Sequence, residues 1–184
     1  MVKRCQSGFS FIEVLIAFFI LATGLIGTVA MQAVAKKNSF DATQRAQALS
    51  MANDIIDRIR ANETEAENYV GDNYGAGANA APAPRCNNVG LNCTAAQIRL
   101  NDQFEWDRRL MGADVISGAA NAGGISGATG CVRFNANGAL TVVISWLGRE
   151  SMTDAAASTG EVNCGAAGTE RRQVVVNTFI WREV

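Results

Sequence analysis

The sequence has 184 residues, of which 48% are hydrophobic, and its formal net charge at pH 7 is −1. Because it contains no histidine, Ser-His-Asp catalysis, Cys-His catalysis and histidine-containing zinc sites are excluded. The near-neutral charge also does not indicate a strongly basic surface for nucleic acid. We therefore expect no enzyme, no cofactor and no metal site, and a nucleic-acid partner is not indicated, although a local basic patch is compatible with this charge.

The first element in the chain is a long apolar segment. Residues 9–35 contain no Lys, Arg, Asp or Pro, and Glu13 is their only charge. At about 1.5 Å per helical residue the segment is roughly 40 Å long, enough to cross a bilayer with some tilt. Lys3, Arg4 and Gly8 precede it.

The position of Glu13 has two interpretations. As a residue at the edge of a membrane helix, it would lie near the lipid headgroups at modest cost. As a functional residue, it would need a partner, because an unpaired charge within a membrane costs about 2.5–3.5 kcal/mol. If the chain were cleaved after Gly8, the freed amine of Phe9 would be a natural partner, in the same chain or in a neighbouring subunit.

Two other targeting signals compete with this interpretation. A secretory signal peptide would end at Ala33-Val34-Ala35, but its apolar core should have about 7–15 residues, and this core is longer and contains an acid. An uncleaved signal anchor explains the hydrophobicity but leaves Gly8 and Glu13 unexplained.

The stretch from Gly8 to Glu13, followed by the uncharged span, resembles the class III signal of type IV prepilins and type II secretion pseudopilins. The resemblance implies that a prepilin peptidase cuts between Gly8 and Phe9 and methylates the new amine of Phe9. It also implies that Glu13 pairs with the terminal amine of a neighbouring subunit during filament assembly.

The helical pattern continues after the span. We predict an amphipathic helix over residues 36–70 that packs on its own domain, with Glu63, Glu65 and Glu67 as a solvated cluster at its end. This segment contains no proline, unlike that of many major pilins. The predicted apolar stripe consists of Phe40, Ala46, Leu49, Ala52, Ile55, Ile56 and Ile59.

Two loops enclose a second predicted helix. Residues 71–85 hold both prolines and are predicted to form a loop. The helix begins at Thr94, where Thr94-Ala95-Ala96-Gln97 fits a capping box, and runs to about Met111. Residues 112–130 are rich in Gly, Ala and Ser and are predicted to be a flexible connection. The expected core anchors of the helix are Ile98, Phe104, Trp106 and Leu110.

The clearest strand signals follow. Two β-rich stretches flank Asn137-Gly138, a strong hairpin turn, and a last strand is predicted over 173–181. Together they predict an antiparallel sheet of three or four strands. Residues 148–169 are predicted to be a loop, and Arg171 and Arg172 to be solvated. The inward face of the middle strand should consist of Leu140, Val142, Ile144 and Trp146.

Five cysteines remain to be assigned, and Cys5 lies in the leader. The other four can pair in three ways. We favour Cys86–Cys93, which are close in sequence, and Cys131–Cys164, which bracket a predicted sheet region. A four-cysteine metal site is the rival, but no C-x-x-C spacing is present. Disulfides indicate an oxidising compartment.

The expected fold is α+β and pilin-like: a long N-terminal helix, half of it transmembrane, packed on a small antiparallel sheet. The segment from Ala48 to Arg60 and the sheet segment ending Ser145-Trp146 resemble PilV-type minor pilins. The resemblance implies a minor pilin that primes or modifies a type IV pilus. The alternatives are a minor pseudopilin of a type II secretion system, or a filament-borne adhesin or DNA-binding module.

The resemblance also implies the organisation of the chain: a cleaved leader at 1–8, a transmembrane and filament-core helix at 9–35, and an extracytoplasmic domain at 36–184. Basic residues flank both ends of the span, so the positive-inside rule does not decide its orientation. The disulfides and the resemblance place the N-terminus in the cytoplasm and the domain in the periplasm, and later at the filament surface. The implied partners are a prepilin peptidase, other minor and major pilins, the pilus assembly platform of the inner membrane, and membrane lipid.

Overall fold

The computed structural model describes residues 8–88, 90–154, 156 and 163–181. The predicted leader residues Lys3, Arg4 and Cys5 lie outside this part of the chain. Two compact units are present, Met1–Ala42 and Thr43–Val184, and each is described by itself.

The first unit contains the N-terminal half of the helix α1, which runs from Phe11 to Ala61. Every described residue from Gly8 to Ser39 is exposed. The most apolar 18-residue window of α1 has a mean hydropathy of 2.4 and none of it is buried, so α1 is long and apolar enough to span a membrane. The hydroxyl of Thr28 donates to Leu25 O at 2.8 Å, which satisfies this polar group within the helix itself.

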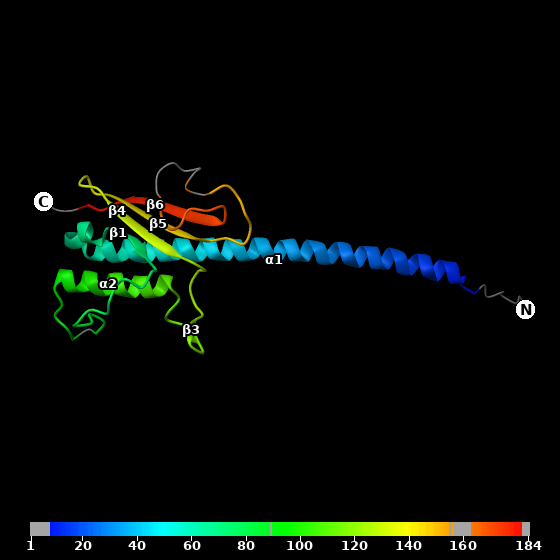
Figure 1. The fold of residues 1–184 in the computed structure, drawn as a ribbon, viewed down its shortest axis with the longest axis horizontal. Coiled ribbons are helices and arrows are strands. Elements are labelled where there is room, and N and C mark those ends of the chain that lie inside the picture. The colour runs from blue at the N-terminus through cyan, green and yellow to red at the C-terminus, as the bar shows by residue number, and fades with distance from the viewer. Residues whose placement is uncertain (1–7, 89, 155, 157–162, 182–184) are drawn as a thin grey trace, which may run out of the picture. The chain divides into compact units, whose positions relative to one another are not determined.

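The second unit combines the C-terminal part of α1 with a sheet and a second helix (Figure 1). A four-stranded antiparallel sheet has the order β1-β4-β5-β6, and the separate strands β2 and β3 form a short hairpin. In Figure 1, α2 lies on one side of this part of α1 and the sheet lies on the other. The elements after α1 are the 3₁₀ helix η1 (Glu63–Tyr69), β1 (Gly71–Tyr74), α2 (Ala95–Leu110), β2 (Ile116–Ser117), β3 (Ala120–Asn121), β4 (Thr129–Phe134), β5 (Ala139–Leu147) and β6 (Arg171–Phe179).

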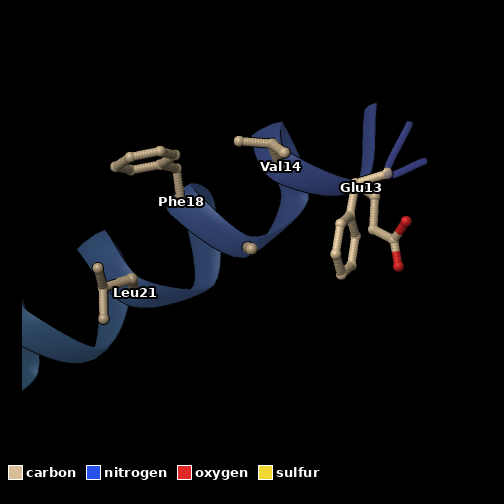
Figure 2. A pocket seen from close by; sticks show the side chains of 6 residues that line it. Glu13, Val14, Phe18 and Leu21 are labelled. Atoms are coloured by element: carbon tan, nitrogen blue, oxygen red, sulfur yellow. The ribbon is translucent and has the colours of Figure 1, made fainter. Parts of the chain in front are cut away.

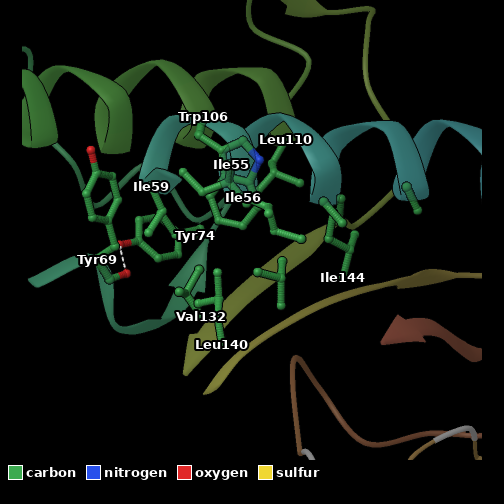
Figure 3. Packing of buried hydrophobic residues seen from close by; sticks show 14 of the residues in the cluster. Ile55, Ile56, Ile59, Tyr69, Tyr74, Trp106, Leu110, Val132, Leu140 and Ile144 are labelled. Atoms are coloured by element: carbon green, nitrogen blue, oxygen red, sulfur yellow. Dashed lines mark hydrogen bonds between the residues drawn. The ribbon is translucent and has the colours of Figure 1, made fainter. Parts of the chain in front are cut away.

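The main core forms around α1 (Figure 3). Ile55, Ile56 and Ile59 are at most 2% exposed, and α2 and the sheet pack against them from different sides. Gly130 permits one close approach, because a Cβ there would lie 2.5 Å from the Trp106 ring. The Trp106 Nε1–H donates to Met51 O at 3.0 Å, so its polar atom is satisfied inside the core. Also buried here are Tyr69, Tyr74, Leu110, Val132, Leu140, Val142, Ile144 and Trp146, which confirms the predicted inward face of β5.

Two local predictions are confirmed. Thr94 caps α2 with both hydrogen bonds of a capping box: its hydroxyl accepts from Gln97 N at 3.3 Å, and the Gln97 side chain accepts from Thr94 N at 2.9 Å. The hairpin between β4 and β5 turns at Asn137-Gly138. Gly138 has a φ of +85°, a backbone conformation that favours glycine.

The structure contains the disulfide pairing that the sequence favoured. Cys86 is bonded to Cys93 and Cys131 to Cys164, with Cα–Cα distances of 6.2 and 5.9 Å. Cys131 and Cys164 are fully buried with Val143 in a second, smaller cluster. Because neighbouring residues of a strand point to opposite faces, this cluster lies on the sheet face away from the main core.

The end of the first helix differs from the prediction. The helix predicted over 36–70 ends at Ala61, and η1 follows. Asn62 stabilises the junction, since its Nδ2 donates to Tyr69 Oη at 3.1 Å and to Ala95 O at 2.9 Å. The expected solvated glutamate cluster is also wrong for Glu65, which forms an ion pair with Arg99 at 3.0 Å.

The predicted loops and anchors need further correction. Residues 71–85 begin with β1, and residues 112–130 contain the hairpin of β2 and β3. Ile98 is 39% exposed and Leu49 43% exposed, so neither is a core residue. Phe104 is only half-buried, because its ring lies beneath two guanidinium groups, including that of Arg85 at 4.5 Å from the ring centroid.

Arg171 was predicted to be solvated, and this is wrong. It is 4% exposed and joins the start of β6 to the preceding loop. Its guanidinium forms an ion pair with Asp154 at 2.7 Å and donates to Asn163 Oδ1 at 2.8 Å and to the carbonyls of Cys164 and Gly165. One side chain therefore fixes the loop that carries the buried disulfide.

We predict that Arg171→Met lowers the free energy of unfolding by about 2–4 kcal/mol, because it leaves buried carbonyls and a carboxylate without their donor. Urea denaturation of the full chain in micelles measures this change. Arg172→Met is the matched control and should change stability by less than about 0.5 kcal/mol, since Arg172 hydrogen-bonds to carbonyl oxygens alone and forms no ion pair within the described residues. Equal losses for the two variants would show that Arg171 has no special role.

The same contact predicts a pH dependence. Hydrogen bonds from Arg171 and from the Gly168 N–H lower the pKa of Asp154 to about 2 from its ordinary value of 3.8. A carboxyl with a lowered pKa contributes stability that is complete above its ordinary pKa and is lost as the pH falls through the lowered one. The stability difference between the wild type and Asp154→Asn should therefore shrink between about pH 5 and pH 2. A constant difference over this range, measured by urea denaturation, would contradict the prediction.

Candidate processing and assembly segment

The segment begins with three residues outside the helix. Gly8, Phe9 and Ser10 are exposed and precede α1, and Phe9 is 85% exposed. Apart from its chain neighbours, no described residue has an atom within 4 Å of the place where a Cβ on Gly8 would be. The helix starts where Ser10 O accepts a hydrogen bond from Glu13 N at 3.0 Å. The peptide bond between Gly8 and Phe9 is therefore in open, non-helical backbone.

Glu13 lies in the first turn of α1 and is exposed. Figure 2 shows its carboxylate pointing away from the helix axis. Within the part of the chain that the structure describes, its side chain forms no ion pair and no hydrogen bond. An acid in a first turn interacts favourably with the helix dipole, typically by about 0.3–1 kcal/mol. This effect is smaller than the roughly 2.5–3.5 kcal/mol that an unpaired charge costs inside a membrane.

Phe9 and Glu13 belong to one shallow hollow on the helix surface (Figure 2). Its walls are otherwise apolar, so the carboxylate of Glu13 is the only charged group that the described residues contribute to it. Such a surface fits a group that carries a cation next to an apolar chain. The residues that line it are Phe9, Glu13, Val14, Ala17, Phe18 and Leu21.

The site residues predicted from the sequence lie in different parts of the structure. Phe9 and Glu13 share the hollow, whereas Gly8 does not line it. The four disulfide cysteines belong to the second unit. The sequence analysis missed the apolar walls of the hollow. Ala17 follows Glu13 by four residues, Phe18 follows Val14 by four, and Leu21 follows Ala17 by four. This helical spacing is the signal that would have found them.

No group of three or more potential metal ligands occurs within the described residues. The hollow offers one carboxylate and apolar side chains. Its chemistry is therefore that of binding, through charge pairing and apolar contact.

Comparison with known proteins identifies two family models in adjoining parts of the chain. Residues 3–29 match the prokaryotic N-terminal methylation motif. Residues 30–104 match the model described as type IV pilin Tt1218. No curated protein and no solved structure matches the chain. The first model includes Gly8, Phe9 and Glu13, and the second covers the C-terminal half of α1, η1, β1 and part of α2.

Proposed function

The chain belongs to the type IV pilin family, and from that premise we propose that it is a minor pilin that primes or modifies the assembly of a type IV pilus. The observation that carries the proposal is Glu13, which has no partner among the described residues and follows an exposed Gly8–Phe9 bond at the start of the uncovered N-terminal half of α1. The family role as a pilin or pseudopilin is structural. Processing by a peptidase and assembly with other pilins follow from that role.

The first step of the proposal is cleavage by a prepilin peptidase after Gly8. The bond to Phe9 lies outside α1, and Gly8 and Phe9 are both exposed. A protease needs accessible, non-helical backbone at the bond it cuts, and this bond meets that requirement. Cleavage would remove residues 1–8 and give Phe9 a terminal amine. Methylation of that amine keeps its positive charge.

The second step is assembly through Glu13. In the bilayer its carboxylate has no cation in the described part of its own chain, and the helix dipole offsets only part of the cost. The terminal amine of a neighbouring pilin would supply the missing charge, and the apolar first turn of that neighbour would fit the hollow around Glu13. A filament would also cover the apolar N-terminal half of α1, where no described residue from Gly8 to Ser39 is buried.

The third part of the proposal concerns location. We place residues 9–35 in the inner membrane and later in the filament core, and residues 36–184 on the periplasmic side. The two disulfides support this orientation, because such bonds persist in oxidising compartments. The N-terminus would then face the cytoplasm, where the peptidase and the assembly platform act on it.

The assignment as a minor subunit rests on α1 itself. α1 is an uninterrupted helix without proline from Phe11 to Ala61, unlike that of many major pilins. Its segment from Ala48 to Arg60 resembles that of PilV-type minor pilins. A minor pseudopilin of a type II secretion system has the same N-terminal signal, so the kind of filament that incorporates the chain separates the two roles.

Expression with and without a prepilin peptidase tests the processing step. With the peptidase, the intact mass should correspond to a chain that starts at methylated Phe9. Without it, residues 1–8 should remain. Gly8→Leu should prevent cleavage, because the added side chain occupies the position before the cut. A chain that starts at Lys36 in either strain would instead indicate signal peptidase cleavage and would refute the proposal.

Substitution of Glu13 tests the assembly step. Glu13→Ala and Glu13→Gln should both be cleaved normally, yet their content in sheared filaments should fall by about tenfold or more, since both lack the charge that attracts the amine. Quantitative immunoblots of filament and membrane fractions measure this. Gln32→Ala, which alters an exposed polar residue of the same helix, is the matched control. Wild-type incorporation of both Glu13 variants would exclude the pairing role.

A further inference from the structure

The sheet face away from the main core has two different halves. One half is covered by the loop that carries Cys164, where Cys131, Val143 and Cys164 are fully buried. The other half has no covering segment within the described residues. It presents Asp72, Arg133, Thr141, Asn177, Phe179 and Trp181, which we call the sheet platform.

Four polar residues of the sheet platform form a row across all four strands. Arg133 of β4 is directly opposite Thr141 of β5, which is directly opposite Asn177 of β6. The Thr141 hydroxyl donates to Asn177 Oδ1 at 2.7 Å, and Arg133 forms an ion pair with Asp72 of β1 at 2.9 Å. Asn177 Nδ2 donates no hydrogen bond to any described residue, so it remains available to a ligand.

Two aromatic side chains adjoin the row. Phe179 is 53% exposed and Trp181 is 72% exposed, and their ring centroids are 6.3 Å apart. The ring of Phe179 rests on Gly138, where a Cβ would lie 2.8 Å from the ring carbons. Gly138, which the hairpin turn requires, therefore also leaves the space that the Phe179 ring occupies. Exposed aromatic pairs that the fold holds in place are typical of interaction sites.

We propose that the sheet platform binds neutral hexopyranose units of a polysaccharide. The apolar C–H face of a pyranose ring stacks on exposed aromatic rings such as those of Phe179 and Trp181. Its hydroxyls both donate and accept, which matches Asn177, Thr141 and the outward atoms of the Arg133–Asp72 pair. This binding goes beyond the structural role in a filament and does not depend on it.

The charges of the sheet platform favour a neutral ligand. Within the described residues its only two charged groups are Arg133 and Asp72, which neutralise each other. A nucleic acid requires cations that are free to replace the counterions of its phosphates, and the described part of this surface offers none beyond the paired Arg133. The polar row also lacks the apolar groove that an amphipathic helix needs.

The chain contains its own reporter for the test. Of its three tryptophans, Trp106 is 0% and Trp146 5% exposed, whereas Trp181 is 72% exposed. Acrylamide will therefore quench mainly Trp181. The full chain is purified in lauryldimethylamine oxide, a detergent without a sugar headgroup, and quenching is measured with dextran or galactomannan. Heparin and an oligothymidylate are the anionic comparators.

We expect dextran or galactomannan to protect Trp181 from acrylamide, and the anionic polymers not to. Phe179→Ala should abolish the protection, because it removes the ring on which the sugar stacks. Asn177→Ala should raise the apparent Kd by roughly three- to tenfold, the change expected for the loss of one hydrogen bond. Ile116→Ala, an exposed apolar residue of β2, is the control and should bind as the wild type. The proposal is overturned if neither neutral polysaccharide protects Trp181, if the anionic polymers protect it equally, or if Asn177→Ala and Phe179→Ala bind as the wild type.

Discussion

The structure depends on one helix, α1, whose two halves need different surroundings: lipid or other helices for the first half, and the core of its own domain for the second. From Gly8 to Ser39 every described side chain is exposed, and the segment is almost wholly apolar. Further along the same helix, Ile55, Ile56 and Ile59 are buried beneath α2 and the sheet. The first part is stabilised only when lipid or other helices cover it, whereas the second is stabilised by contacts within its own chain. The second unit of such a subunit can therefore fold while the first part of α1 still needs lipid or neighbouring helices to cover it.

Polar contacts determine how the second unit closes around α1. Arg58 reaches α2, where it pairs with Asp102 at 2.7 Å and with Glu105 at 3.0 Å. Asp102 also accepts the Tyr69 hydroxyl at 2.7 Å, and burial raises the pKa of Tyr69 well above its ordinary value, so this hydroxyl keeps its proton. These bonds join α1, η1 and α2 at one place. They give the helices a defined register, which apolar packing alone does not supply.

The sequence predicted features that local physics determines. The alternation from Leu140 to Trp146, the Asn137-Gly138 turn and the capping box at Thr94 each depend on residues close together in the chain. The N-terminal signal was readable for the same reason, because its glycine, aromatic and acid occur at fixed spacing. The matches to the methylation motif and the pilin model agree with that reading.

Features that depend on distant partners could not be predicted in this way. β1 is short and polar, and it is a strand only because β4 pairs with it and the buried Asp107 accepts the Gly75 N–H at 2.6 Å. Arg171 appeared solvated, since the carboxylate and carbonyls that bury it come from a loop without periodicity.

The division between the two units has a consequence for function. The main core consists entirely of residues after Thr43, so substitutions at Glu13 or Gly8 remove no core contact. The sheet platform likewise contains no residue of the first unit. Loss of assembly and loss of surface binding should therefore be separable by mutation, because neither set of residues contributes to the packing of the other. A pilin built in this way can change its exposed sheet face without changing the residues for which we propose roles in processing and assembly.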